Sequence, residues 1–459
     1  MKMTLPNGFL WGNSTSSMQT EGATHEGGKG ASVYDLRKPN ADNAGWDVTI
    51  DEYHRYAEDY DLMQAMNMNC YRLQISWSRV CPDGDGDFNE AGIAFYHQLI
   101  NALLARNITP MICLYHFDMP LALAQKYNGF LSRHVVDAFV RFGKRMVDEF
   151  GKQVPYWITF NEQNLYSSSY ARVYAGCLKD GKQDAEIYTI ANHVMVAHAQ
   201  VANYLHATTT AKIGGMLAYE ECYAATANPR DNQFARQVNE FLNRNLLDVF
   251  VHGHYSNQVL TYTKNHHIDF DFTVADQKDF DELKSDFIAF SYYRSSLIDA
   301  SRVPINTIPN RYLDYGEVHN AYTPYNEWNW NVDALGFRDV LTRVYNEYGV
   351  PMFPIENGIG VRENYDGHEI QDDYRIDYHR QHIQAMKAAV AEDGVKVIGY
   401  LGWGLIDIPS SSGNVDKRYG AVYVNQTNTD SKDLKRIPKK SFYWFKHVIA
   451  SNGSDLSSD

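Results

Sequence analysis

HVVDAFVRFGKRMVDEFGKQVPYWITFNEQN, residues 134–164, carries the helix-and-strand unit from which the fold can be predicted. Apolar residues recur every three or four positions over 134–151, which predicts an amphipathic helix. An apolar run rich in aromatic and β-branched residues follows over 154–161, which predicts a buried strand. This run ends at Asn161 and Glu162, so polar side chains stand where the strand leaves the core.

The same kind of apolar run occurs seven more times along the chain, at 8–12, 69–76, 107–115, 211–219, 285–292, 351–356 and 396–403. Eight strands alternating with helical stretches favour an α/β fold, a (β/α)8 TIM barrel. A doubly wound sheet would place a G-x-G-x-x-G turn after its first strand, and LWGNSTSSMQTEG (10–22) has none. The chain contains no Pro/Ser-rich linker, so we expect a single domain over residues 1–459.

Composition narrows the classes of partner. Hydrophobic residues make up 44% of the 459 positions and the net charge is −14, which favours a large core and disfavours nucleic acid or an anionic membrane as a ligand. No apolar window is long enough for a membrane span, and no signal peptide is evident. Five cysteines without C-x-x-C spacing argue against disulfides and zinc, so we expect a cytoplasmic protein without metal or cofactor. The sequence leaves open whether the chain forms a homo-oligomer.

Two of the expected strands end on a glutamate. Glu162 closes VPYWITFNE and Glu356 closes PMFPIE. A single glutamate at a strand exit can simply complement the dipole of the next helix. Two of them at the carboxyl-terminal mouth of one barrel indicate glycoside hydrolysis, which needs one protonated and one ionised carboxyl group. The sequence cannot give their separation.

The other strand exits also carry polar or aromatic side chains. We expect these at the mouth of the barrel: Gln19, Glu21, His116, Asp118, Tyr292, Tyr293, Trp403 and Asp407. Arg72, inside the second strand, is a cation that could hold an ionised carboxylate. Packing in the core is a sufficient alternative for Tyr292 and for Trp403, but not for His116 or Gln19, because polar groups there need partners.

These segments occur in one order along nearly the whole chain, from FLWGNSTSSMQTEG (9–22) through YRLQISWSR (71–79), LYHFDMP (114–120), TFNEQN (159–164), FSYYRS (290–295), WNWNVDALG (328–336) and PIENG (354–358) to GYLGWGLID (399–407). As an ordered set they resemble glycoside hydrolase family one, which contains β-glucosidases and phospho-β-glycosidases. The resemblance implies a retaining hydrolase with Glu162 as acid/base and Glu356 as nucleophile.

The resemblance also implies roles for the surrounding residues. The residues that would bind the glycosyl unit are Gln19, His116, Asn161 and Trp403. Tyr293 and Arg72 would orient the nucleophile, and Trp330 would line the aglycone side. The sequence departs from the usual pattern of the family at Phe117, where Trp is common, and at Gln163, where Pro is common.

The segment WGLIDIPSSSGNVDKRYGAVYV (403–424) bears on the substrate. Members acting on free sugars typically place an acidic residue here, which would repel a phosphate, and this chain has none at that place. Ser410, Lys417 and Tyr419 instead resemble the phosphate-binding Ser…Lys-x-Tyr arrangement of phospho-β-glycosidases, in which one cation and two hydroxyl groups hold a 6-phosphate. The alternative is a solvated loop with an ordinary surface lysine.

We therefore expect hydrolysis of a 6-phospho-β-D-glucoside, such as a phosphorylated disaccharide or an aryl glucoside. Ser411 stands where phospho-β-galactosidases of the family carry Trp, which favours the gluco configuration. A 6-phospho-β-galactosidase, a β-glucosidase acting on free sugars and a phosphosugar-binding barrel without hydrolase activity are the alternatives. A basic cluster further on is interpreted as a solvated face, and it consists of Lys435, Arg436, Lys439 and Lys440.

Overall fold

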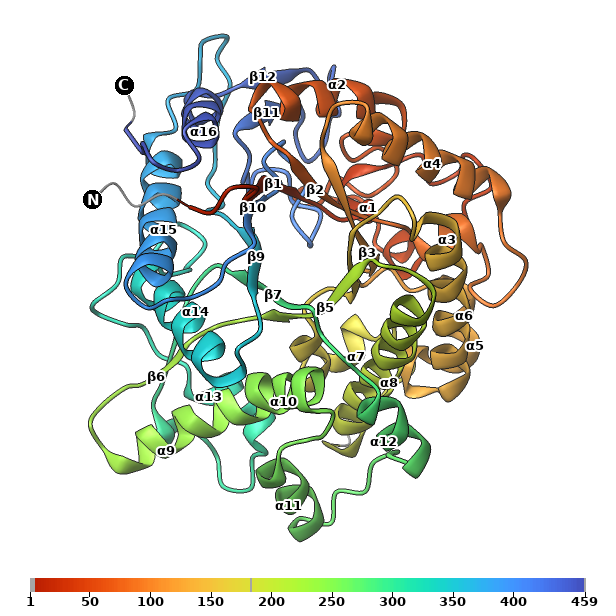
Figure 1. Ribbon diagram of the computed structural model, residues 1–459, viewed down its shortest axis with the longest axis vertical. Helices are drawn as coiled ribbons and strands as arrows, with labels where there is room; N and C mark the ends of the chain where they lie inside the picture. Colours follow the sequence, from red (N-terminus) through yellow and green to blue (C-terminus); the bar gives the residue numbers. More distant parts are fainter. Residues whose placement is uncertain (1–4, 182–183, 458–459) are drawn as a thin grey trace.

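A parallel barrel of eight strands forms the centre of the computed structural model, which describes residues 5–181 and 184–457 (Figure 1). The strands follow the order β10-β1-β2-β3-β4-β5-β7-β9. The barrel closes between β9 and β10, where Met352 pairs with Val397 and the Ile398 amide donates to the Met352 carbonyl oxygen over 3.0 Å. The strands are β1 Leu10–Ser14, β2 Cys70–Gln74, β3 Thr109–Tyr115, β4 Tyr156–Phe160, β5 Lys212–Ala218, β7 Phe287–Tyr292, β9 Met352–Asn357 and β10 Gly399–Trp403. The predicted (β/α)8 fold is confirmed.

Helices surround the barrel on its outer side (Figure 1). The longer ones are α2 Glu52–Ala65, α4 Glu90–Leu104, α6 Arg133–Phe150, α8 Asp184–Thr208, α9 Pro229–Val238, α10 Asn245–His252, α11 Asn257–Asn265, α12 Val274–Asp281, α14 Ala334–Tyr348, α15 Asp373–Ala391 and α16 Lys440–Ala450. Two short pairs lie outside the barrel, the parallel pair β6 Cys222–Ala224 with β8 Ser296–Ile298 and the antiparallel pair β11 Val422–Val424 with β12 Arg436–Pro438.

The amphipathic helix predicted over 134–151 is α6, and it packs aromatic side chains against β4 and against Trp77, which follows β2. Phe139 stacks on Phe160 of β4 with ring centroids 4.4 Å apart, and Phe142 stacks on Trp77 at 5.4 Å. Burying an aromatic side chain of this kind stabilises the fold by about 1.5–3 kcal/mol. The apolar layer between strands and helices therefore fixes the strands from outside.

Alternation along the strands decides which side chains enter the barrel. Successive strand residues point to opposite faces, so residues two apart share a face. The inner apolar cluster includes Cys70, Ala289 and Leu401. Two residues further along the same strands stand Arg72, Ser291 and Trp403. These side chains therefore lie above the apolar plug, towards the carboxyl-terminal mouth of the barrel.

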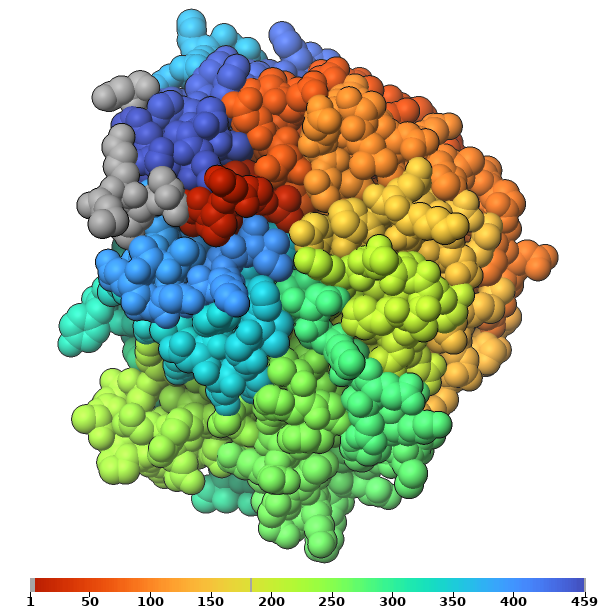
Figure 2. All heavy atoms as spheres, in the orientation of Figure 1, coloured from red at the N-terminus to blue at the C-terminus, as the bar shows by residue number. Residues whose placement is uncertain are grey.

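The first and last described segments of the chain lie close together. In the space-filling view the red N-terminal segment packs between blue segments from the last part of the chain (Figure 2). Trp11 Nε1 donates to Asn452 Oδ1 over 3.0 Å, and Asn452 Nδ2 donates to the Leu5 carbonyl oxygen over 3.1 Å. Among the helices described, none combines the length and apolar character needed to cross a membrane.

Candidate active site

A cavity of about 380 Å³ lies at the carboxyl ends of the barrel strands. Eleven of the twelve predicted site residues line it: Gln19, His116, Asn161, Glu162, Tyr293, Trp330, Glu356, Trp403, Ser410, Lys417 and Tyr419. Arg72, the twelfth, is completely buried and contacts the cavity through its neighbours. The strand exits, far apart in sequence, therefore converge on one site.

Glu356 is held in a fixed orientation at the end of β9. Arg72 Nη1 forms an ion pair with its Oε1, and the Tyr293 hydroxyl donates to its Oε2 over 2.9 Å. Burial raises the pKa of Glu356, whereas the charge of Arg72 and the hydrogen bond from Tyr293 oppose this rise. Both contacts stabilise the ionised carboxylate, which is the form that can act as a nucleophile.

Glu162 follows β4 in the left-handed region, with φ 47° and ψ 60°. This conformation costs about 1–3 kcal/mol for a residue other than glycine, and such strain is concentrated at functional sites. Ser291 Oγ donates to Glu162 Oε1 over 2.5 Å. Burial, with a further contribution from the charge of Glu356, raises the pKa of Glu162 to about 8. Glu162 therefore keeps its proton at neutral pH.

The two carboxyl groups thus lie in different environments within one cavity. Glu356 has a cation and a hydroxyl donor on its oxygens, whereas Glu162 has one hydroxyl donor and a negative neighbour. Environments that separate the pKa values of two acids assign the acid and the nucleophile of a glycosidase. The arrangement can donate a proton and supply a nucleophile at the same bond.

Arg72 connects Glu356 to two groups that can bind hydroxyls. Its Nη2 donates to Asn161 Oδ1 over 2.7 Å and lies 3.2 Å from His116 Nδ1. Because a guanidinium only donates, His116 Nδ1 accepts and the imidazole proton is on Nε2. Burial, and then the charge of Arg72, hold the pKa of His116 well below its usual range, so the ring is neutral. Asn161 Nδ2 is a buried donor with no partner among the described residues.

Gln19 and Trp403 complete this part of the wall. The Gln19 Nε2 donates to the Pro409 carbonyl oxygen over 2.7 Å, and Ser16 Oγ donates to Gln19 Oε1 over 2.6 Å. The Trp403 ring stacks on the His116 imidazole with centroids 5.5 Å apart. Gln19 therefore ties the exit of β1 to the segment that leads to Ser410.

Lys417 is the cation of the predicted phosphate site. Its Nζ lies 3.6 Å from the centroid of the Trp330 ring, and it forms no ion pair with any carboxylate of the described residues. Burial, and then the charge of Arg294, lower the pKa of Lys417 to about 8. Ser410 Oγ lies 2.9 Å from Ser412 Oγ, so two hydroxyls adjoin each other on the same wall. A half-buried ammonium without a carboxylate can bind an anionic group.

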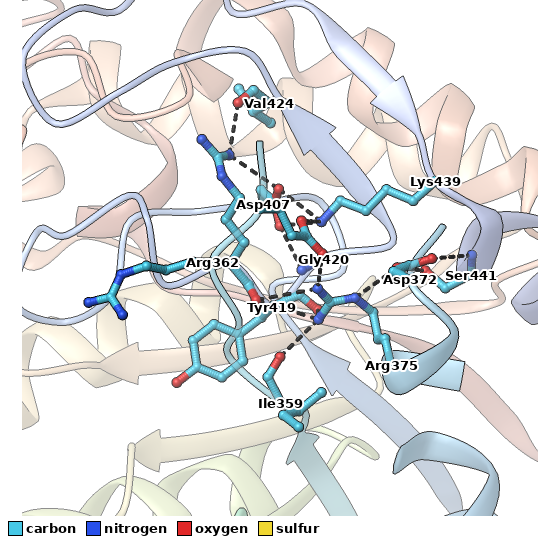
Figure 3. Close-up of polar contacts among 12 residues, drawn as sticks. Ile359, Arg362, Asp372, Arg375, Asp407, Tyr419, Gly420, Val424, Lys439 and Ser441 are labelled. Atoms are coloured by element: carbon cyan, nitrogen blue, oxygen red, sulfur yellow. Dashed lines mark hydrogen bonds and ion pairs between the residues drawn. The ribbon is translucent and has the colours of Figure 1, made fainter. Parts of the chain in front are cut away.

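A cluster of buried charges binds the backbone at Tyr419 and Gly420, close in sequence to Lys417 (Figure 3). Arg375 Nη1 donates to the carbonyl oxygens of Tyr419 over 2.7 Å and of Ile359 over 2.8 Å. Asp407 accepts from the Gly420 amide over 2.7 Å and pairs with Lys439 over 3.1 Å. Arg375 therefore joins the loop after Glu356 to the segment that carries Lys417.

Four residues expected at the mouth lie outside the cavity. Asp407 belongs to the cluster just described, and Asp118 accepts from Gln74 Nε2 over 2.6 Å. Glu21 pairs with Arg79 over 2.7 Å. Tyr292 is buried and donates to a backbone carbonyl, as the core-packing alternative predicted.

The interpretation of the basic cluster as a solvated face is wrong for Arg436 and Lys439, which are buried. Arg436 pairs with Asp59 over 2.8 Å, and Lys439 pairs with Asp407 over 3.1 Å and with Glu363 over 2.5 Å. These partners come from distant parts of the sequence, so local composition could not reveal them.

Sequence reasoning gave no role to several cavity residues, among them Ser291, Glu220 and Arg294. Ser291 shares the inward face of β7 with Ala289, and this alternation was a usable signal. Glu220 and Arg294 each stand two residues beyond the last residue of β5 and β7, respectively. Loop residues at a barrel mouth often carry function, and this rule could have flagged them.

A parallel barrel that brings two buried carboxyl groups in different environments to a shared cavity is suited to glycoside hydrolysis. Comparison with known proteins agrees: the chain belongs to glycosyl hydrolase family 1, whose model matches residues 1–454. It is 35% identical to the aryl-phospho-beta-D-glucosidase BglC of Bacillus subtilis (strain 168), covering 98% of each chain, and 36% identical to the phospho-cellobiase of Klebsiella oxytoca, covering 99% of each. The family 1 β-glucosidase structure from Thermotoga maritima superposes with a TM-score of 0.86 at 28% identity, covering 98% of each chain.

Proposed function

We propose that the protein hydrolyses 6-phospho-β-D-glucosides to glucose 6-phosphate and an alcohol, with retention of configuration. The observation that carries the proposal is the position of Lys417, a half-buried cation without a carboxylate partner among the described residues, in the same cavity as Glu162 and Glu356. A sugar whose anomeric carbon lies at the two carboxyl groups would bring its phosphate to this ammonium. The names of the relatives, an aryl-phospho-β-D-glucosidase and a phospho-cellobiase, support the same chemistry.

In the first step a Glu356 carboxylate oxygen attacks the anomeric carbon. The glycosidic bond breaks with its electron pair going to the leaving oxygen, which takes the proton of Glu162. In the second step water attacks the same carbon, its proton passes to Glu162, and Glu356 leaves as a carboxylate. The raised pKa of Glu162 suits this exchange of roles between acid and base.

The remaining wall residues would bind the glycosyl unit. Asn161 Nδ2 and His116 Nε2 provide donors to the hydroxyls, while Gln19 adds its amide and Trp403 an apolar face for the ring. Ser410, Lys417 and Tyr419 would hold the phosphate through charge-assisted hydrogen bonds. Trp330 would lie on the aglycone side, where the leaving group is a sugar or an aryl alcohol.

The proposal places the enzyme in the cytoplasm, where a phosphorylated sugar would be available. All five cysteines are unpaired in the described residues, as is usual for a reducing compartment.

The test is a comparison of p-nitrophenyl 6-phospho-β-D-glucoside with p-nitrophenyl β-D-glucoside at the same concentrations. We expect kcat/KM to favour the phosphorylated compound by about two orders of magnitude or more, since charge-assisted bonds to the phosphate contribute roughly 1.5–3 kcal/mol each. Equal activity on both compounds would remove the phosphate assignment and leave a β-glucosidase. A third arm with the galacto-configured phosphate tests the gluco preference directly.

A further inference from the structure

A second charged pair faces the cavity, apart from the two carboxyl groups and the proposed phosphate ligands. Arg294 Nε donates to Glu220 Oε1 over 2.9 Å, and Arg294 Nη1 donates to Glu317 Oε1 over 2.7 Å. Glu220 and Arg294 line the cavity, whereas Glu317 does not. Their side chains are 33% and 24% exposed, so a ligand in the cavity can reach both.

The fold holds this pair rigidly. Glu220 follows β5 and Arg294 follows β7, and these two strands are neighbours in the barrel. Immediately beyond the pair the two segments form the parallel strands β6 and β8. There the Ser296 amide donates to the Glu221 carbonyl oxygen over 2.8 Å. The pair is therefore fixed between two sets of backbone hydrogen bonds, as a binding group should be.

The pair lies on the leaving-group side of the site. β5 also neighbours β4, whose exit carries Glu162. Glu220 and Glu162 line the same cavity, and the charge of Glu220 is a minor cause of the raised pKa of Glu162. Because Glu162 protonates the leaving oxygen, groups beside it on the outer wall contact the aglycone rather than the phosphorylated sugar.

Among the described residues, the Glu220–Arg294 pair has one free acceptor and one free donor, which hydroxyl groups can complement. Glu220 Oε2 and Arg294 Nη2 make no hydrogen bond with any residue in the described parts of the chain, which leaves one acceptor and one donor side by side. A sugar hydroxyl can donate to the carboxylate while its neighbour accepts from the guanidinium. An aryl ring offers neither group and would leave Glu220 Oε2 and Arg294 Nη2 without a hydrogen-bond partner.

We infer that Glu220 and Arg294 bind the hydroxyl groups of a leaving sugar, so that the preferred substrate is a phosphorylated disaccharide rather than an aryl glucoside. The inference rests on the proposed function and deepens it by assigning the aglycone class. The competing interpretation is a structural brace, since Arg294 also links the exit of β5 to Glu317.

The experiment compares two substrates that share the phosphorylated glucose, cellobiose carrying the phosphate on its non-reducing unit and p-nitrophenyl 6-phospho-β-D-glucoside. For Glu220→Ala and Arg294→Met we expect kcat/KM on the disaccharide to fall about 10–100-fold, the loss of a hydrogen bond to a charged group, and to change less than about threefold on the aryl compound. Any effect of Arg294→Met through Lys417 would appear in both substrates, because both carry the phosphate. The matched control is Glu317→Gln, which alters the other ion pair of Arg294, outside the cavity, and should leave kcat/KM on both substrates unchanged.

Equal losses on the two substrates in Glu220→Ala would overturn the inference in favour of the brace, and no loss on either would exclude an aglycone contact. Failure of the proposed function would look different, because it appears in the unmodified protein. There, neither phosphorylated substrate would be cleaved faster than its unphosphorylated counterpart, and the inference would fall with it.

Discussion

Two clusters of buried charged side chains lie near the mouth of the barrel, and they differ in how many of their hydrogen-bond donors and acceptors have a partner. In the Arg375 cluster, all three guanidinium nitrogens of Arg375 are bonded: Nε to Asp372 over 2.9 Å, Nη2 to Glu363 over 2.5 Å and Nη1 to two carbonyl oxygens. Lys439 is likewise held by Glu363 and Asp407. No atom of these five side chains lines the cavity.

In the Arg72 cluster, which comprises Arg72, Asn161, Glu162 and Glu356, some hydrogen-bond donors and acceptors beside the cavity have no partner among the described residues. Arg72 Nε and Asn161 Nδ2 have no partner among the described residues, and Glu162 has a single hydrogen-bonded oxygen. Burying polar groups without partners is costly, so an incomplete cluster at a cavity indicates a ligand that completes it. Buried charge alone therefore does not define a binding site, whereas buried charge with unpartnered donors or acceptors next to a cavity does.

The largest expected effect distinguishes one glutamate of each cluster. Glu356→Gln should lower kcat on the order of 10⁴–10⁶-fold, because it removes a covalent nucleophile. The isosteric amide should leave the fold and substrate binding nearly intact. Steady-state kinetics with the phosphorylated p-nitrophenyl substrate measure the loss, and near-normal turnover would show that Glu356 is not the nucleophile.

Glu363→Gln should instead lower the stability of the protein and leave turnover nearly unchanged. Glu363 pairs with both Arg375 and Lys439, so the amide leaves two buried cations short of one negative charge. We expect a loss of about 3 kcal/mol of unfolding free energy, as is typical of a broken buried ion pair, with kcat of the folded enzyme close to normal. Thermal unfolding followed by circular dichroism measures the first quantity. A variant with unchanged stability and lost turnover would reverse our assignment of the two clusters.

Lys417→Met removes the cavity ammonium that has no carboxylate partner among the described residues. KM for the phosphorylated substrate should rise about 10–100-fold, while kcat changes less, since a charge-assisted bond to the phosphate is lost. In the unmodified protein the same lysine gives a pH dependence. The pKa of Lys417 is lowered to about 8, so the ammonium is present below this pH and KM should rise as pH increases through it. A KM that is independent of both the substitution and pH would argue against a phosphate contact.

Ser291→Ala should give the smallest effect. The Ser291 hydroxyl donates to Glu162 and so favours its charged form. Removing this donor should raise the pKa of Glu162 above its value of about 8, so the alkaline limb of kcat should move to higher pH by less than about one unit. Measuring kcat at saturation keeps Lys417 paired with phosphate, and Ser291→Thr, which retains a hydroxyl, should restore the original profile. A shift to lower pH would contradict the assigned direction.

The sequence predicted the strands, and hence the exits that carry Glu162 and Glu356, because local periodicity decides both. It also brought out Lys417, whose placement on the cavity follows from its position after β10. It failed for Arg436 and Lys439, whose carboxylate partners lie hundreds of residues away or in another loop. Glu220 and Arg294 escaped notice because the direction of a loop side chain depends on neighbouring strands, not on its own segment.

The most direct test of the central claim is the mass of the protein after incubation with 2,4-dinitrophenyl 2-deoxy-2-fluoro-6-phospho-β-D-glucoside. The fluorine slows both steps and the good leaving group restores the first, so a covalent intermediate should accumulate. We predict one added fluorosugar phosphate per chain, attached to Glu356 and absent from Glu356→Gln. Labelling of another residue, or equal labelling by the sugar without phosphate, would contradict the account.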